Sequence, residues 1–144
     1  MKATELMIGD WVFDNFHQAK ARVNTLTRAL LWGAVEEKDG FYDDKQLRYE
    51  DVKPIPLTEE ILRKNGWGFN DEDAKSAPRT WSGGGLTLQS ADDCGYRIVV
   101  TSDYDDEDTS NTPFILHYVH ELQHALRLRR IEKEIEIVNT DYHQ

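Results

Sequence analysis

The first 56 residues divide into short strand-like stretches separated by turn residues, and this pattern limits the fold more than any other feature. Residues 10–14, 22–27 and 47–52 mix β-branched or aromatic residues with polar ones, while residues 30–35 form an apolar run that suits a buried strand or a short helix. Gly9 and the Lys38-Asp39-Gly40 segment supply turns. Short strands joined by tight turns over this length predict a small SH3-like barrel.

The remainder of the chain mixes helix and strand signals. Thr58 is placed to cap a helix over residues 59–63 that ends at Asn65-Gly66, and residues 86–89 and 96–101 resemble the two strands of a hairpin. A long helix is expected over residues 114–128, after a capping Thr112 and before a closing edge strand at 135–137.

The predicted class is therefore α+β. A small SH3-like β region (1–56) precedes an α+β region (57–144), in which an antiparallel sheet packs against the C-terminal helix 114–128. The two regions are expected either as separate domains or as one continuous domain.

Charge and cysteine content narrow the possible partners and the compartment. The 144 residues carry 27 acidic and 17 basic side chains, a net charge of -10 that disfavours nucleic acids and anionic membranes as partners. The longest apolar run, residues 29–35, is too short to cross a membrane. A single cysteine, Cys94, excludes an intrachain disulfide framework, so we expect a cytoplasmic protein.

One constellation suggests chemistry, the His120-Glu121-Leu122-Gln123-His124 segment. It fits the H-E-x-x-H pattern, in which two histidines one helical turn apart hold zinc and the glutamate acts as general base. The helical wheel places both histidines opposite Val119, Leu122 and Leu126. Residues 120–126 are similar to the active-site helix of zincin metalloproteases.

The rest of the zincin pattern is missing. Arg127 and Arg130 occupy the positions where extended zincin motifs have a glycine and a third histidine. His117 would extend the strip and His143 is a more distant candidate ligand, but three histidines on one straight helix cannot surround a tetrahedral ion. The simpler interpretation is a polar helix face without metal.

Other motifs are weaker still. The acidic segment 103–108 lacks the glycine and glutamate of an EF-hand, the Ser-Gly-Gly-Gly segment 82–85 lacks the lysine of a P-loop, and Cys94 has acidic neighbours that disfavour a reactive thiolate. The four tryptophans are expected mainly in the core, whereas exposure of Trp11 and Trp32 on one face would favour a binding surface.

Three stretches carry a family resemblance: residues 1–12 (MKATELMIGDWV), 52–62 (VKPIPLTEEIL) and 118–126 (YVHELQHAL). They resemble a family of small uncharacterised proteins of anaerobic gut bacteria, often associated with prophages or mobile elements. The resemblance implies no known activity, and it implies that the helix keeps a Val-His-x-Leu-Gln packing pattern in which the glutamate and second histidine of the zinc motif are not required.

We therefore predict an accessory or protein-interaction module of phage or mobile-element origin, without catalysis or cofactor, that binds an unidentified protein partner. The sequence leaves its oligomeric state open. The alternative is a zinc-dependent hydrolase that uses segment 120–124, with His120, His124 and a third ligand such as His117 on the metal and Glu121 as the catalytic base.

Overall fold

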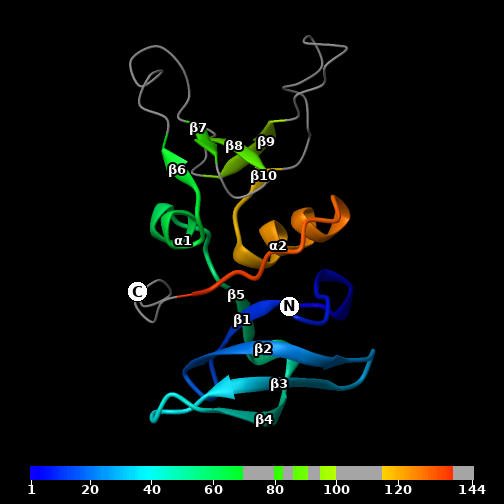
Figure 1. Ribbon diagram of the computed structural model, residues 1–144. Helices are drawn as coiled ribbons and strands as arrows, with labels where there is room; N and C mark the ends of the chain where they lie inside the picture. The colour runs from blue at the N-terminus through cyan, green and yellow to red at the C-terminus, as the bar shows by residue number, and fades with distance from the viewer. Residues whose placement is uncertain (70–79, 83–85, 91–94, 100–114, 138–144) are drawn as a thin grey trace. The chain divides into compact units, whose positions relative to one another are not determined.

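The computed structural model describes residues 1–69, 80–82, 86–90, 95–99 and 115–137 (Figure 1). The chain forms two compact units. The first joins Met1–Pro56 to Tyr118–His124, and the second joins Leu57–His117 to Ala125–Gln144. Helix α2 (Val119–Leu128) therefore contributes its first residues to one unit and its last residues to the other.

The first unit is built on a five-stranded antiparallel sheet with the order β4-β3-β2-β1-β5. Strands β1, β2 and β3 each pair with the next strand along the chain, and β5 returns to pair with β1. One 3-10 turn, η1 (Ala3–Glu5), precedes β1, and another, η2 (Tyr49–Asp51), leads into β5. The strands are β1 (Trp11–Asp14), β2 (Ala19–Leu26), β3 (Leu31–Glu36), β4 (Tyr42–Leu47) and β5 (Val52–Pro54).

Alternation along these strands sends apolar side chains to one face, where they form a core. Gly33 of β3 lies on this face at a point of close approach. A β-carbon at this position would lie 2.9 Å from Cδ1 of Leu47 and 3.1 Å from the carbonyl oxygen of Arg22. The core residues are Leu6, Val12, Ala21, Val23, Leu31, Val35, Leu47 and Val52.

The predicted strands at 10–14 and 22–27 are confirmed, and residues 30–35 lie in a strand, β3, and not in a helix. The prediction at 47–52 is wrong, because β4 ends at Leu47 and η2 follows. The polar stretch 42–47 forms a strand because the turn before it fixes its register. Gly40 has a φ of 86°, and the Glu37 amide donates to the Phe41 carbonyl at 2.7 Å.

The second unit contains another antiparallel sheet, with the order β10-β9-β8-β7-β6. The predicted hairpin is confirmed as β8 and β9, which pair with Leu88 opposite Ile98. The described strands are β6 (Gly68–Phe69), β7 (Thr80–Ser82), β8 (Thr87–Ser90), β9 (Tyr96–Val99) and β10 (Ile115–Leu116).

Helix α1 (Glu59–Lys64) forms where its capping signals predicted it. The Thr58 hydroxyl accepts a hydrogen bond from the Ile61 amide at 3.3 Å. At the other end Gly66 has a φ of 98°, a left-handed conformation that ends the helix without strain.

The predicted helix 114–128 begins later than expected, at Val119. Ile115 and Leu116 pair with β9 instead, and Tyr118 bridges to Pro56, so the chain is still extended where helix was predicted. Residues 112–114 lie outside the described residues. Helix α2 is thus ten residues long.

The edge strand predicted at 135–137 is also absent, since residues 131–137 form neither helix nor strand. Ile135 and Ile137 are nevertheless buried while Glu134 and Glu136 are exposed. The alternation of apolar and acidic residues at 134–137 therefore indicated which side chains are buried, but not that the segment pairs as a strand.

The α+β class is confirmed: two antiparallel sheets accompany helix α2. Trp11, Trp67 and Trp81 are buried as expected, whereas Trp32 is 36% exposed. Among the described residues, none of the helices has the length and apolar character needed to cross a membrane.

Candidate functional site

The histidines of the H-E-x-x-H segment lie in the first unit, and His124 is engaged by an aspartate from the start of the chain. Its Nε2 lies 2.6 Å from Oδ2 of Asp10, a residue with no exposed surface. The same oxygen accepts a hydrogen bond from the Met7 amide at 2.7 Å. The ring nitrogen that a zincin would turn toward zinc is thus already paired.

Gln123, the last residue of the Val-His-x-Leu-Gln pattern, ties helix α2 to the first sheet. Its Oε1 accepts from the Trp11 amide at 2.8 Å, and its Nε2 donates to the Gly9 carbonyl at 2.9 Å. Gln123 is buried, as are Val119 and Leu126, which lie on one side of it on the helical wheel. A polar residue beside the apolar positions of a helix is the sequence signal for such a buried contact.

Glu121 caps the N-terminus of helix α2. One of its carboxylate oxygens accepts from the Tyr118 amide at 3.1 Å, which satisfies an amide that has no partner inside the helix. The negative charge also suits the first turn of α2. A general base would need this carboxylate to face a metal-bound water instead.

His120 is buried between two rings, although the wheel placed it on the polar face. It stacks on Tyr118 with a centroid distance of 5.9 Å and meets His124 edge-on at 5.5 Å. Burial lowers the pKa of His120, against the opposing effect of the Asp10 charge. Its Nδ1 has no hydrogen-bond partner among the described residues.

No group of three histidine, cysteine, aspartate or glutamate side chains within the described parts of the chain is arranged to hold a metal ion. The ring of His117 lies against Gly95, where an added β-carbon would come within 3.0 Å of it. Cys94, the acidic segment 103–108, residues 83–85 and His143 lie outside the described residues. Within the described ranges, His120 and His124 are therefore not part of a three-ligand group.

A hollow opens at the turn between β3 and β4, with a volume of about 590 Å³. Two aromatic residues line it: Phe41 is 73% exposed and Tyr42 is 46% exposed. We call this region the hairpin surface, and its lining residues are Glu37, Lys38, Asp39, Phe41, Tyr42 and Asp43.

The walls of the hollow are held by local contacts. Glu37 pairs with Lys45 at 2.8 Å, and Asp39 accepts a hydrogen bond from the Phe41 amide at 3.2 Å. Partial burial raises the pKa of Tyr42, and the negative charge of Glu36 raises it further. The Tyr42 ring lies 6.2 Å from that of Trp11. The Tyr42 ring therefore lies near the Trp11 ring, whereas the Phe41 side chain is mostly exposed at the turn.

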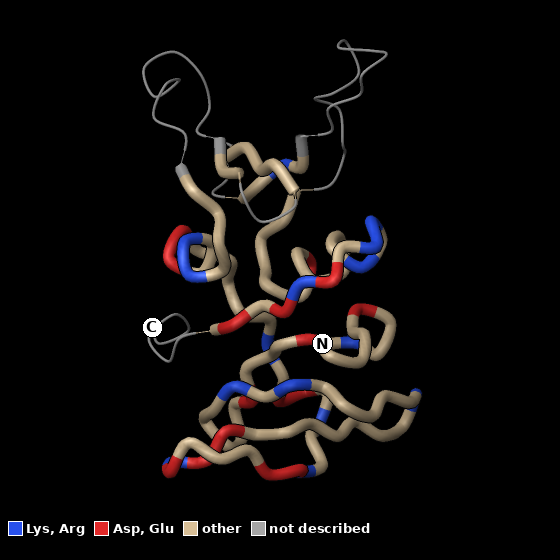
Figure 2. The backbone as a smooth tube through the Cα atoms, in the orientation of Figure 1, with Lys and Arg blue, Asp and Glu red and all other residues tan. Residues whose placement is uncertain are grey.

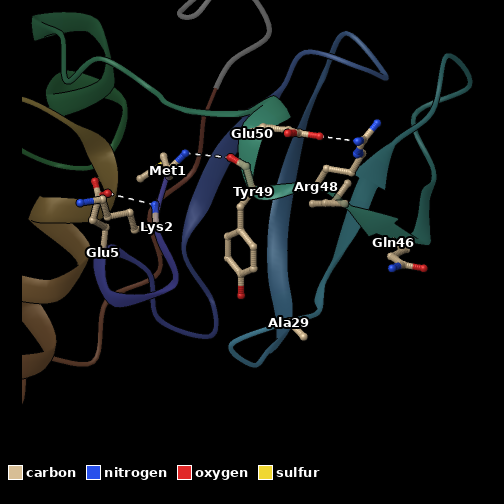
Figure 3. A pocket seen from close by; sticks show the side chains of 9 residues that line it. Met1, Lys2, Glu5, Ala29, Gln46, Arg48, Tyr49 and Glu50 are labelled. Atoms are coloured by element: carbon tan, nitrogen blue, oxygen red, sulfur yellow. Dashed lines mark hydrogen bonds and ion pairs between the residues drawn. The ribbon is translucent and has the colours of Figure 1, made fainter.

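A second hollow, of about 710 Å³, lies near the first residues of the chain (Figure 3). Most of its charged groups find partners within its own lining. The Met1 amino group donates to the Tyr49 carbonyl at 2.8 Å, the Lys2 amide donates to Glu5, and Arg48 pairs with Glu50. This internal pairing leaves the hairpin surface as the better candidate for a binding site.

Comparison of the chain with protein-family models, with curated proteins and with solved structures finds no significant match.

Proposed function

We propose that this chain is a non-enzymatic protein-interaction module, an accessory protein of phage or mobile-element origin that binds its partner through the hairpin surface. The observation that carries the proposal is the exposure of Phe41 and Tyr42 side by side at the edge of a hollow. Exposed aromatic rings lose little conformational entropy on binding and are enriched among the residues that dominate interface energies.

The state of helix α2 supports the same proposal. Gln123 and His124 hold the helix to residues 9–11, and Glu121 caps its first turn. A zinc-dependent hydrolase, the alternative, would require the metal to be bound by Nδ1 of His124 or His124 to leave Asp10, and would require Glu121 to leave the helix terminus. No observed contact favours that rearrangement, so the alternative rests on the sequence motif alone.

The strand arrangement supports an SH3-like classification of the first unit. Its short antiparallel strands follow one another in space and the last returns to the first, as expected for a small barrel. A rigid sheet of this kind presents its connecting turns for recognition. The turn between β3 and β4 is the one that carries the hairpin surface.

Site-specific photocrosslinking tests the proposal, and the chain offers a matched control. Phe41 and Phe16 are both 73% exposed, but Phe16 lies in the turn between β1 and β2. A benzophenone side chain at position 41 should capture a discrete protein in cells that express the chain, and the same group at position 16 should not.

The captured protein must then bind the purified chain reversibly. Phe41→Ser should weaken that binding at least tenfold, the loss typical of a central aromatic contact, while Phe16→Ser should leave it unchanged. Equal capture at both positions, or equal affinity of both variants, would overturn the assignment of this surface.

A further inference from the structure

The lining of the hairpin surface also indicates what kind of segment it binds. We propose that it takes up an arginine side chain from a basic peptide segment of the partner protein. This inference rests on the proposed function, because it names the chemistry of the partner at the same surface.

Charge is the first argument. Between Glu36 and Lys45 the chain carries five acidic side chains and two lysines, a net charge of -3 within one hairpin. Figure 2 shows these acidic positions along β3, β4 and the turn between them. Lys45 is already paired with Glu37, and the hydrogen bond to Glu37 together with the charges of Glu37 and Asp43 raises the pKa of Lys45. The hollow is thus left with unneutralised negative charge, which attracts a cation.

Exposed rings are the second argument, because they select among cations. A guanidinium is planar and weakly hydrated, so it stacks on an aromatic face while its N–H groups donate to a carboxylate. Phe41 and Tyr42 provide the faces, and Asp43 and Asp39 provide acceptors in the same lining. A lysine ammonium also matches the charge and can lie over a ring, but it lacks the planar group that stacks on the ring while donating to a carboxylate.

The same sheet already contains this type of contact. The Arg22 guanidinium lies 5.6 Å from the centroid of the Trp11 ring, and the Lys20 ammonium lies at the same distance from it. Lys20 also pairs with Glu36 at 3.7 Å. Trp11 is therefore covered by cations of the chain itself, whereas Phe41 is left exposed for a cation from outside.

Other ligand classes fit less well. Carboxylates in the lining repel the phosphates of nucleic acids, and the net charge of -10 strengthens that repulsion. The volume of about 590 Å³ lies in the range of small-molecule pockets, but such pockets are mostly apolar and this one has acidic walls. A basic peptide segment satisfies the charge and the rings together.

Labelled eight-residue peptides test the proposal by fluorescence anisotropy. One alternates arginine with serine, the second has lysine in place of arginine, and the third has glutamate. The arginine peptide should bind several-fold more tightly than the lysine peptide, and the glutamate peptide should not bind. Phe41→Ser and Asp43→Asn should each weaken arginine-peptide binding at least fivefold, whereas Phe16→Ser should not change it.

Equal binding of the arginine and lysine peptides with no effect of Phe41→Ser would overturn the proposal, since it would reduce the interaction to net charge. If position 41 crosslinks a protein but the arginine peptide does not bind, this inference fails and the proposed function stands. If neither is observed, both fail.

The chain itself contains a basic segment, Arg127 to Arg130 with Leu128 85% exposed, which gives the test a further arm. Light scattering of the purified chain should give the monomer mass at all concentrations tested. Self-association that Phe41→Ser abolishes would make a second copy of the chain the occupant, and would overturn the assignment to a different protein.

Discussion

At the scale of single residues, the ion pair between buried Asp10 and half-buried His124 lies beside the buried ring of His120. His120 is 6% exposed, and Asp10 has no exposed surface. Burial is the main cause that lowers the pKa of His120, and the nearby His124 acts in the same direction. A histidine held neutral by burial links folding to pH.

The sign of that link follows from the direction of the shift. In the unfolded chain His120 takes up a proton near its ordinary pKa of 6.5, and in the folded chain only at lower pH. Below about pH 6.5 the unfolded state therefore binds more protons than the folded state. The free energy of unfolding consequently decreases as the pH is lowered, by at most about 1.4 kcal/mol per pH unit for this one group.

His120→Phe tests this dependence, because it keeps a ring against Tyr118 and removes the titrating group. Urea unfolding at pH 7.5, 6.5 and 5.5 should show a smaller loss of stability on acidification in the variant than in the parent chain. Parallel curves for the two proteins would show that His120 does not contribute to the pH dependence.

Sequence reasoning succeeded where a residue acts on its neighbours and failed where its partner is distant. Thr58 caps an amide three positions away, and the spacing alone revealed it. Asp10 and His124 are 114 positions apart, and Gln123 reaches the Trp11 amide across 112 positions. Without the tertiary fold, the histidines of α2 could be assigned only to a polar face or to a metal.

At the scale of secondary-structure elements, α2 uses for packing the side chains that the zinc motif would use for catalysis. Four hydrogen bonds, from Glu121 to the Tyr118 amide, from Gln123 to Trp11 and Gly9, and from His124 to Asp10, engage polar side chains in its first two turns. A zinc site built on the motif would have to accommodate or replace the contacts of Glu121 and His124.

Metal analysis of the purified, untagged chain therefore has a defined expectation. Zinc content should be below stoichiometric and should not change in His120→Ala or His124→Ala, as measured by inductively coupled plasma mass spectrometry after dialysis against zinc-containing buffer. One zinc per chain that both variants lose would revive the hydrolase and would imply a rearranged α2.

The boundaries of the elements were predictable only where local chemistry sets them. The Gly40 turn and the Thr58 cap lie within their own segments, so the β3–β4 turn and α1 were found. The start of α2 was misplaced because apolar residues at 115, 116 and 119 suit a helix, a strand or a change from one to the other. Pairing of Ile115 and Leu116 with β9 decided between them.

At the scale of the whole molecule, the two units share one helix. Val119 and Leu122 have no exposed surface and belong to the first unit, while Ala125 and Leu126 belong to the second. A helix propagates cooperatively along its hydrogen bonds, so a break between residues 124 and 125 should affect both units.

Ala125→Pro places such a break at the boundary. Proline removes the amide donor of residue 125, clashes with the carbonyl of residue 121 and disfavours helical geometry at His124, at a cost of about 3 kcal/mol or more. We expect the denaturation midpoints of both units to fall together. Amide resonances of Val12 and Val23 report on the first unit in such an experiment, and the indole resonances of Trp67 and Trp81 report on the second.

Leu128→Ala is the matched control, because it changes the same helix at a side chain that is 85% exposed and should leave both midpoints nearly unchanged. If Ala125→Pro lowers only the midpoint of the second unit, residues 119–124 are held by their own contacts to Trp11, Gly9 and Asp10 and need no continuous helix. In that case the first unit carries the hairpin surface independently of the rest of the chain, since every residue that lines it lies before Pro56.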